Sequence, residues 1–173
     1  MSSDKLKTGL FAMFCARNYV DKAFITTISP LESWPEMYYV HAPGTVVFIS
    51  YTSLKKCDAK RLIQTMATDF PDRTHKLTVA KGGSKQAIHF LLEHHIEFIP
   101  LSLLLFDRSQ HSLVPAYRLL TPSQRDVLMH RYSTRTCDWP KIHVSDPQAI
   151  YMGAIVGDIL HNMSDDIYRT VIN

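Results

Sequence analysis

The chain has 173 residues, of which 46% are hydrophobic and 20% are charged, and its formal net charge is +3. This balance is typical of a globular protein and excludes a disordered, collagen-like or low-complexity chain. A chain of this length buries about 70% of the surface that its unfolded form exposes, so it can form a core without metals or disulfides.

Membrane and secretory segments are not expected. The longest apolar runs, such as residues 99–106, are far shorter than the ~18 residues of a transmembrane helix. The N-terminus lacks the apolar centre of a secretory signal. Cys15, Cys57 and Cys137 are widely separated and form no CxxC pair, which favours reduced thiols. We therefore expect an intracellular protein with no metal site, no cofactor and no membrane association.

The first part of the chain opens with a helix. Apolar residues at helical spacing predict it over residues 5–19, with Ser3 as a candidate N-cap. Residues 20–44 contain three prolines, at 30, 35 and 43, which predict loops and short extended pieces. The β-branched and aromatic run from Thr45 to Tyr51 then predicts a buried strand.

Two further helices and strands follow. Asp58 is expected to cap a helix that ends before Asp72, because Pro71 cannot continue it. Residues 76–80 are predicted to form a strand, Lys81–Gly83 a turn, and Ser84 the cap of a helix that runs to residue 95. Residues 96–106 read as an extended apolar segment. The alternation of strands and helices predicts an α/β domain.

A polar stretch at residues 107–112 marks the predicted boundary between an α/β domain, 1–108, and a smaller α+β domain, 109–173. Thr121 before Pro122 predicts the start of a helix, and Asp146 before Pro147 predicts a second start or a turn. Residues 142–144, 158–163 and 167–172 are expected to be extended, the last two joined as a hairpin across residues 164–166.

The second domain carries an ordered set of short motifs. They are His-Ser-Leu-Val-Pro at 111–115, Trp-Pro-Lys-Ile at 139–142, Ser-Asp-Pro at 145–147, Tyr-Met-Gly at 151–153, Val-Gly-Asp at 156–158 and Tyr-Arg at 168–169. In this order they resemble the assembly domain of the fifth subunit shared by eukaryotic nuclear RNA polymerases, a family with archaeal counterparts. The resemblance implies a non-catalytic, structural subunit of a multisubunit DNA-directed RNA polymerase.

The resemblance also implies which residues serve assembly with the largest subunit. Glycines at 153 and 157 suit positive φ or close backbone approach, and Tyr151 suits a buried ring. Ser145 and Ile150 depart from the family pattern, which commonly has Gly and Arg there, so the chain is read as a divergent or specialised paralogue. The implied assembly residues are Pro115, Pro140, Ile142, Asp146, Pro147, Tyr151, Gly153, Gly157, Tyr168 and Arg169.

The first domain more faintly resembles the family's N-terminal jaw domain, which archaeal members lack. That implies a eukaryotic or eukaryote-derived polymerase and a nuclear location, nucleolar if the protein is specific to polymerase I. Residues 55–85 hold 8 basic and 3 acidic residues. A contact with downstream duplex DNA, weak and non-specific, is expected at Lys81, Gly82, Gly83, Ser84 and Lys85, where a helix start and two lysines would attract phosphate.

Two other functions stay open. Asp58, Lys60 and Asp72 superficially suggest a metal-dependent nuclease, although their order is reversed and too few carboxylates converge for two-metal chemistry. A stand-alone transcription adaptor that carries an assembly-like domain is the second alternative. The histidines at 89, 94 and 95 lack the i, i+4 spacing of a shared metal site. No small-molecule substrate is expected.

Overall fold

The computed structural model describes residues 3–17, 28–31, 34–42, 45–73, 75–105, 112–135 and 138–173. The chain divides into two compact units. Unit 1 comprises residues 1–11 and 20–106, and unit 2 comprises residues 12–19 and 107–173. The expected boundary at 107–112 and the expected helix end at residue 19 lie largely outside the described residues.

Unit 1 is built on a mixed five-stranded sheet with the order β1–β2–β3–β4–β5. The strands β1 to β3 pair antiparallel, and β3 to β5 pair parallel. The elements are α1 (Ser3–Ala16), β1 (Ser29–Leu31), β2 (Trp34–Ala42), β3 (Thr45–Leu54), α2 (Lys56–Asp69), β4 (His75–Gly83), α3 (Lys85–Glu93), β5 (Ile96–Pro100) and α4 (Leu101–Leu104). The helices α2 and α3 form the crossovers between the parallel strands.

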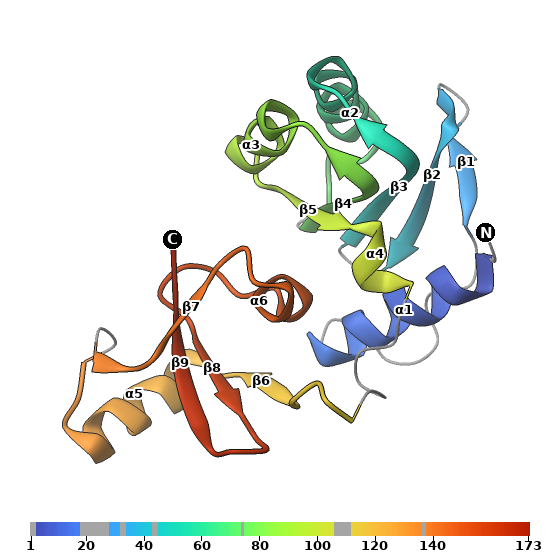
Figure 1. Ribbon diagram of the computed structural model, residues 1–173. Helices are drawn as coiled ribbons and strands as arrows, with labels where there is room; N and C mark the ends of the chain where they lie inside the picture. Colours follow the sequence, from blue (N-terminus) through green and yellow to red (C-terminus); the bar gives the residue numbers. More distant parts are fainter. Residues whose placement is uncertain are drawn as a thin grey trace. The chain divides into compact units, whose positions relative to one another are not determined.

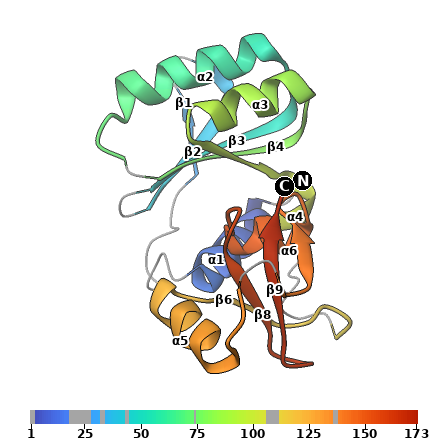
Figure 2. The same cartoon turned by 90° about the vertical axis from the view of Figure 1, so that its left-hand side faces the viewer.

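Helices cover both faces of this sheet. Figures 1 and 2 show α2 and α3 on one face, with α4 and the N-terminal part of α1 on the other. The first six residues of β3 are all buried, as expected for a strand covered on two sides. A Cβ on Gly9 of α1 would lie 1.8 Å from the carbonyl oxygen of Leu104, so the backbones of α1 and α4 approach closely. The predicted α/β character of this unit is therefore observed.

Several local predictions for unit 1 were wrong. Residues 34–42 form one long strand, because β3 supplies a partner along most of its length. The helix α2 begins two residues before Asp58, whose carboxylate instead accepts the N–H of Lys55 at 2.8 Å from inside the first turn. Residues 101–104 are helical and not extended.

The predicted turn at Lys81–Gly83 was also wrong. These residues belong to β4, where Gly82 and Gly83 pair in parallel with Ser53 and Leu54. The N–H of Ser84 then donates to the carbonyl of Leu54 at 3.0 Å. Pairing with β3 thus extends the strand through two glycines that alone favour a turn.

Unit 2 is a four-stranded sheet with the order β6–β8–β9–β7 and two helices. Its elements are β6 (Tyr117–Leu119), α5 (Pro122–Tyr132), β7 (Lys141–His143), α6 (Pro147–Met152), β8 (Ile159–Asn162) and β9 (Ile167–Ile172). The predicted hairpin is confirmed, since β8 pairs antiparallel with β9. Ile159 packs with Leu128 of α5, while the buried Leu160 points to the opposite face by strand alternation.

Helix starts predicted from short polar motifs are confirmed in both units. The side chain of Ser84 accepts from the N–H of Ala87, and Thr121 accepts from Gln124. Asp146 accepts from the N–H of Gln148 at 2.8 Å, with Pro147 at the first helical position. Each oxygen satisfies an N–H that has no partner within its helix.

Candidate assembly and nucleic-acid surfaces

The helix α6 gathers the most specific motif of unit 2. Asp146 caps its start, and Gly153 ends it in the left-handed conformation with φ of 67°. Gly157 has φ of 94° and donates its N–H to the carbonyl of Val171 at 2.9 Å. The predicted need for glycine at both positions is confirmed. These motif residues therefore define the backbone path of unit 2.

Arg17, which the sequence did not single out, completes this end of α6. Its Nε donates to the carbonyl oxygen of Tyr151 at 3.0 Å, and its terminal nitrogen donates to that of Ile150. The side chain is 8% exposed. A cation placed against the last carbonyls of a helix satisfies acceptors that have no intrahelical partner. The C-terminal part of α1 thus belongs to unit 2, although the sequence assigned the whole helix to the first domain.

Arg17 lies more than 130 positions before its partners in the sequence, so no local pattern could have indicated it. It also packs against Gly153, where a Cβ would meet the guanidinium at 3.0 to 3.2 Å. The glycine is therefore required both by its φ and by the arginine beside it.

Most of the other implied assembly residues are structural. Ile142 and Tyr151 are buried. The carbonyl of Pro115 accepts from Gln148 Nε2 at 3.2 Å, and that of Pro140 accepts from the Thr170 N–H at 2.7 Å. These bonds join segments far apart in unit 2. These motif residues therefore help to maintain the fold of unit 2.

Tyr168 belongs to a row of rings on the α5 face of the sheet. Its ring stacks on His161 at 4.4 Å and meets Trp139 edge-on at 5.4 Å, and Trp139 in turn meets Tyr132 at 5.7 Å. His161 Nε2 lies 2.7 Å from Asp166 Oδ1. Burial, and then the nearby Asp166 charge, raise the pKa of Tyr168 above its ordinary value. Arg169 lies on the opposite face of β9, by strand alternation.

Exposed apolar side chains concentrate in unit 2. Seven of the eight large apolar residues found exposed in the described part of the chain belong to it. Ile155 and Val156, 68% and 49% exposed, follow Gly153 closely in the loop between α6 and β8. The others are Leu113, Val127, Tyr132, Met163 and Ile167. An exposed apolar pair on a loop fixed by two glycines is a candidate contact surface.

The structure separates the two lysines of the expected DNA contact. Lys85 is the first residue of α3 and lines a hollow of about 470 Å³ together with Lys56 of α2. Lys81 instead lines a different cavity beside α4. Gly82 and Gly83 are half-buried in β4. Lys81 and Lys85 therefore line different hollows, and Ser84 and Lys85 are the residues of the expected site that lie at the helix start.

The residues considered for metal chemistry do not come together. Asp58 lies in the first turn of α2, and Asp72 lies beyond its end. Within the described ranges, no three His, Cys, Asp or Glu residues are placed to hold a metal ion. Among the described helices, none is long and apolar enough to cross a membrane.

Comparison with known proteins identifies the second unit. Residues 106–164 match the family model "RNA polymerase Rpb5, C-terminal domain". The DNA-directed RNA polymerase subunit Rpo5 of Methanothrix thermoacetophila is 44% identical over 55 residues, which are 32% of this chain and 70% of that protein. The subunits Rpo5 of Thermococcus onnurineus and Thermococcus celer are 36% and 38% identical over 55 residues, which are 67% of each.

Unit 2 therefore has the fold and motifs of a polymerase assembly domain. The chain belongs to the Rpb5 family of RNA polymerase subunits, which includes the archaeal Rpo5 proteins. The archaeal relatives are less than half as long as this chain. One solved structure, of EndoMS in apo form, aligns over 51% of this chain and 42% of its own with 9% identity and a TM-score of 0.36, too low to indicate a shared fold.

Proposed function

We propose that this protein is a non-catalytic subunit of a multisubunit DNA-directed RNA polymerase, in which unit 2 docks on the largest subunit. The observation that carries this proposal is the match of unit 2 to archaeal polymerase subunits over two thirds or more of their length. The archaeal subunits are shorter than this chain, and the matched domain makes up two thirds or more of their length. Unit 1 is then an addition to the domain that they share with this chain.

The exposed pair Ile155 and Val156 is the part of unit 2 that we assign to docking. It projects from the most specific motif segment, between Gly153 and Gly157. Burial of apolar area in an interface is favourable at roughly 25 cal/mol per Å². An apolar loop that is held in one conformation also loses little entropy on binding.

Affinity purification of the tagged full-length chain from its own cells tests this function. We expect the two largest polymerase subunits to co-purify in stoichiometric amounts. The double variant Ile155→Asp with Val156→Asp should lose them, whereas Val127→Asp, an equally exposed site on α5, should keep them. Recovery of the chain without large subunits would overturn the polymerase assignment and favour the adaptor alternative. Retention by the double variant would overturn only the docking loop.

Unit 1 is proposed to lie beside downstream duplex DNA. The start of α3 supports this, because Ser84, Lys85 and Lys56 lie together where α2 and α3 both begin. Lysines at two helix starts attract phosphates without reading the base sequence. Few phosphates are neutralised by so small a surface, so binding is weak and falls steeply with salt.

Elongation complexes assembled with variant proteins test the DNA contact. Lys56→Ala with Lys85→Ala should shorten the lifetime of the complex in moderate salt while the variant protein stays bound. The matched change Lys7→Ala with Lys141→Ala removes two lysines elsewhere and should leave the lifetime unchanged. If elongation complexes with the two double variants had equal lifetimes, the proposed contact between the start of α3 and DNA would be wrong.

The presence of unit 1 also supports a eukaryotic or eukaryote-derived polymerase and a nuclear or nucleolar location. The relatives that match unit 2 are archaeal, and they match 32% of this chain. Fluorescent tagging in the source cells distinguishes a nuclear from a nucleolar pattern. A cytoplasmic signal that persists during active transcription would contradict the nuclear assignment.

A further inference from the structure

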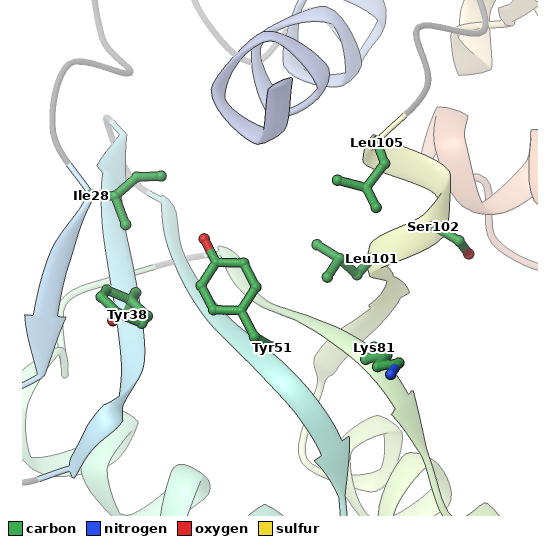
Figure 3. A pocket seen from close by; sticks show the side chains of 7 residues that line it. All are labelled: Ile28, Tyr38, Tyr51, Lys81, Leu101, Ser102 and Leu105. Carbon is green, nitrogen blue, oxygen red and sulfur yellow. The ribbon is translucent and has the colours of Figure 1, made fainter. Parts of the chain in front are cut away.

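A second cavity lies in unit 1, away from the start of α3. Its volume is about 900 Å³, and it is lined by Ile28, Tyr38, Tyr51, Lys81, Leu101, Ser102 and Leu105. Figure 3 shows the ring of Tyr51 between Ile28 and Tyr38 on one side and the α4 leucines on the other. The lining combines aliphatic and aromatic side chains from β2, β3 and α4, so most of its surface is apolar.

The two tyrosines give this cavity an aromatic wall with polar tips. Their ring centroids are 5.6 Å apart, and the rings meet edge to face at 68°. Burial, followed by the neighbouring Tyr38, raises the pKa of Tyr51, so its hydroxyl keeps its proton through the physiological range and can donate a hydrogen bond. Because the rings are not parallel, they do not form a platform on which successive nucleobases would stack.

Lys81 supplies the charge of the cavity. It is exposed at the rim, and within the described ranges no carboxylate forms an ion pair with it. Among the described residues that line the cavity, no other is charged. The cavity therefore favours a ligand that presents bulky apolar groups to the walls and a negative charge to the rim.

We propose that this cavity binds a peptide segment of a partner protein in which bulky apolar side chains alternate with carboxylates. The apolar groups enter between Tyr51 and the leucines of α4, and a carboxylate pairs with Lys81. A charged side chain at the rim adds selectivity, because an uncharged or basic segment leaves Lys81 unpaired. Lys81 thus serves a different partner from Lys85, although the two lysines are close in the sequence.

A binding assay with the purified full-length chain tests this proposal. The probe is a fluorescein-labelled synthetic peptide that repeats Asp-Phe-Glu-Leu, measured by anisotropy and by amide chemical shifts. We expect the largest shifts at Tyr51, Lys81 and Ser102. Lys81→Glu should weaken binding about threefold to tenfold, as expected for reversing one partly exposed charge pair. Ser102→Trp should abolish it by filling the cavity from an exposed position.

Matched controls separate this site from charge attraction alone. Lys85→Glu makes the same charge change on the other surface and should leave the affinity within about twofold of the parent. Equal weakening by Lys81→Glu and Lys85→Glu would overturn the proposal, as would equal affinity for the peptide with Asn and Gln in place of its acids. If oligo-dT bound at the same residues more tightly than the peptide, the proposal would be overturned and the cavity would be assigned to nucleic acid. If the parent chain self-associates and Ser102→Trp removes that self-association, the proposal would be overturned, because a second copy of the chain would then be the occupant of the cavity.

Absence of any peptide binding by a correctly folded chain would also overturn the proposal. Circular dichroism of each variant establishes that it is folded. The assay uses no polymerase, so its failure is distinguishable from failure of the proposed polymerase function.

Discussion

The two units differ in how they bury apolar surface. In unit 1, helices cover both faces of the sheet, and Leu92 is its one large apolar side chain exposed among the described residues. Unit 2 is smaller, and seven such side chains of its described part face solvent. A small domain that leaves apolar surface uncovered is suited to completing its burial against a partner. The difference indicates that unit 1 is stabilised by its own core, and it supports the proposal that unit 2 is the part that docks on a partner.

The largest expected effect is a loss of stability that tests whether unit 1 is stabilised by its own core. Phe48 is fully buried and contacts Phe70 at 5.5 Å between ring centroids. Phe48→Ala should lower the free energy of unfolding by about 3 to 5 kcal/mol, because it leaves a cavity in the core. Urea unfolding followed by circular dichroism measures the loss. Val127→Ala, at an exposed site, should change the value by less than about 0.5 kcal/mol.

Amide spectra of Phe48→Ala sharpen this comparison. We expect the signals of β8 and β9 to keep their positions when the unit 1 signals broaden. Simultaneous loss of both sets would show that the units fold as one cooperative body.

The second prediction concerns the arginine that ties α1 to α6. Gly153→Ala should cost about 1 to 3 kcal/mol, since it forces a side chain onto a left-handed residue beside Arg17. Arg17→Ala should cost a similar amount, because two helix-end carbonyls lose their donor. A double-mutant cycle measured by urea unfolding should give less than the sum of the two losses, because removing Arg17 relieves the contact with the new methyl group. Strict additivity would contradict the proposed contact.

A smaller effect is expected at the cap of α6. Asp146→Ala removes the oxygen that accepts the Gln148 N–H and should cost about 1 kcal/mol, while Asp146→Ser should recover most of it. Thermal unfolding measures both. Polymerase binding of the stable fraction should be unchanged, because the side chain acts on the fold. Loss of binding without loss of stability would instead make Asp146 a contact residue.

The smallest predicted effect is at alkaline pH. The raised pKa of Tyr51 means that the folded state holds the phenolic proton more tightly than the unfolded state. The stabilisation is complete below the ordinary pKa of tyrosine and is lost as the pH rises through the folded value. Tyr51→Phe should therefore reduce the decline of thermal stability above about pH 10. Unchanged alkaline behaviour would show that Tyr51 does not contribute to it.

Short-range chemistry made much of unit 2 predictable. Thr121 and Asp146 cap their helices as expected, and Gly153 and Gly157 take positive φ. Each depends on an interaction within a few residues, which a sequence motif carries directly. The same ordered motifs identified the family, because they encode the turns and caps of one domain.

Hydrogen bonds between residues far apart in the sequence decided the features that were predicted wrongly or not predicted. The amino-acid sequence by itself determined the starts of α3, α5 and α6, the buried strand at Thr45 and the family of unit 2. Only the tertiary structure drew Gly82 and Gly83 into β4, placed Arg17 on α6, and showed that Lys81 and Lys85 line different hollows. The reason is that a neighbouring strand or a distant helix end supplies hydrogen-bond partners whose positions no local residue pattern specifies.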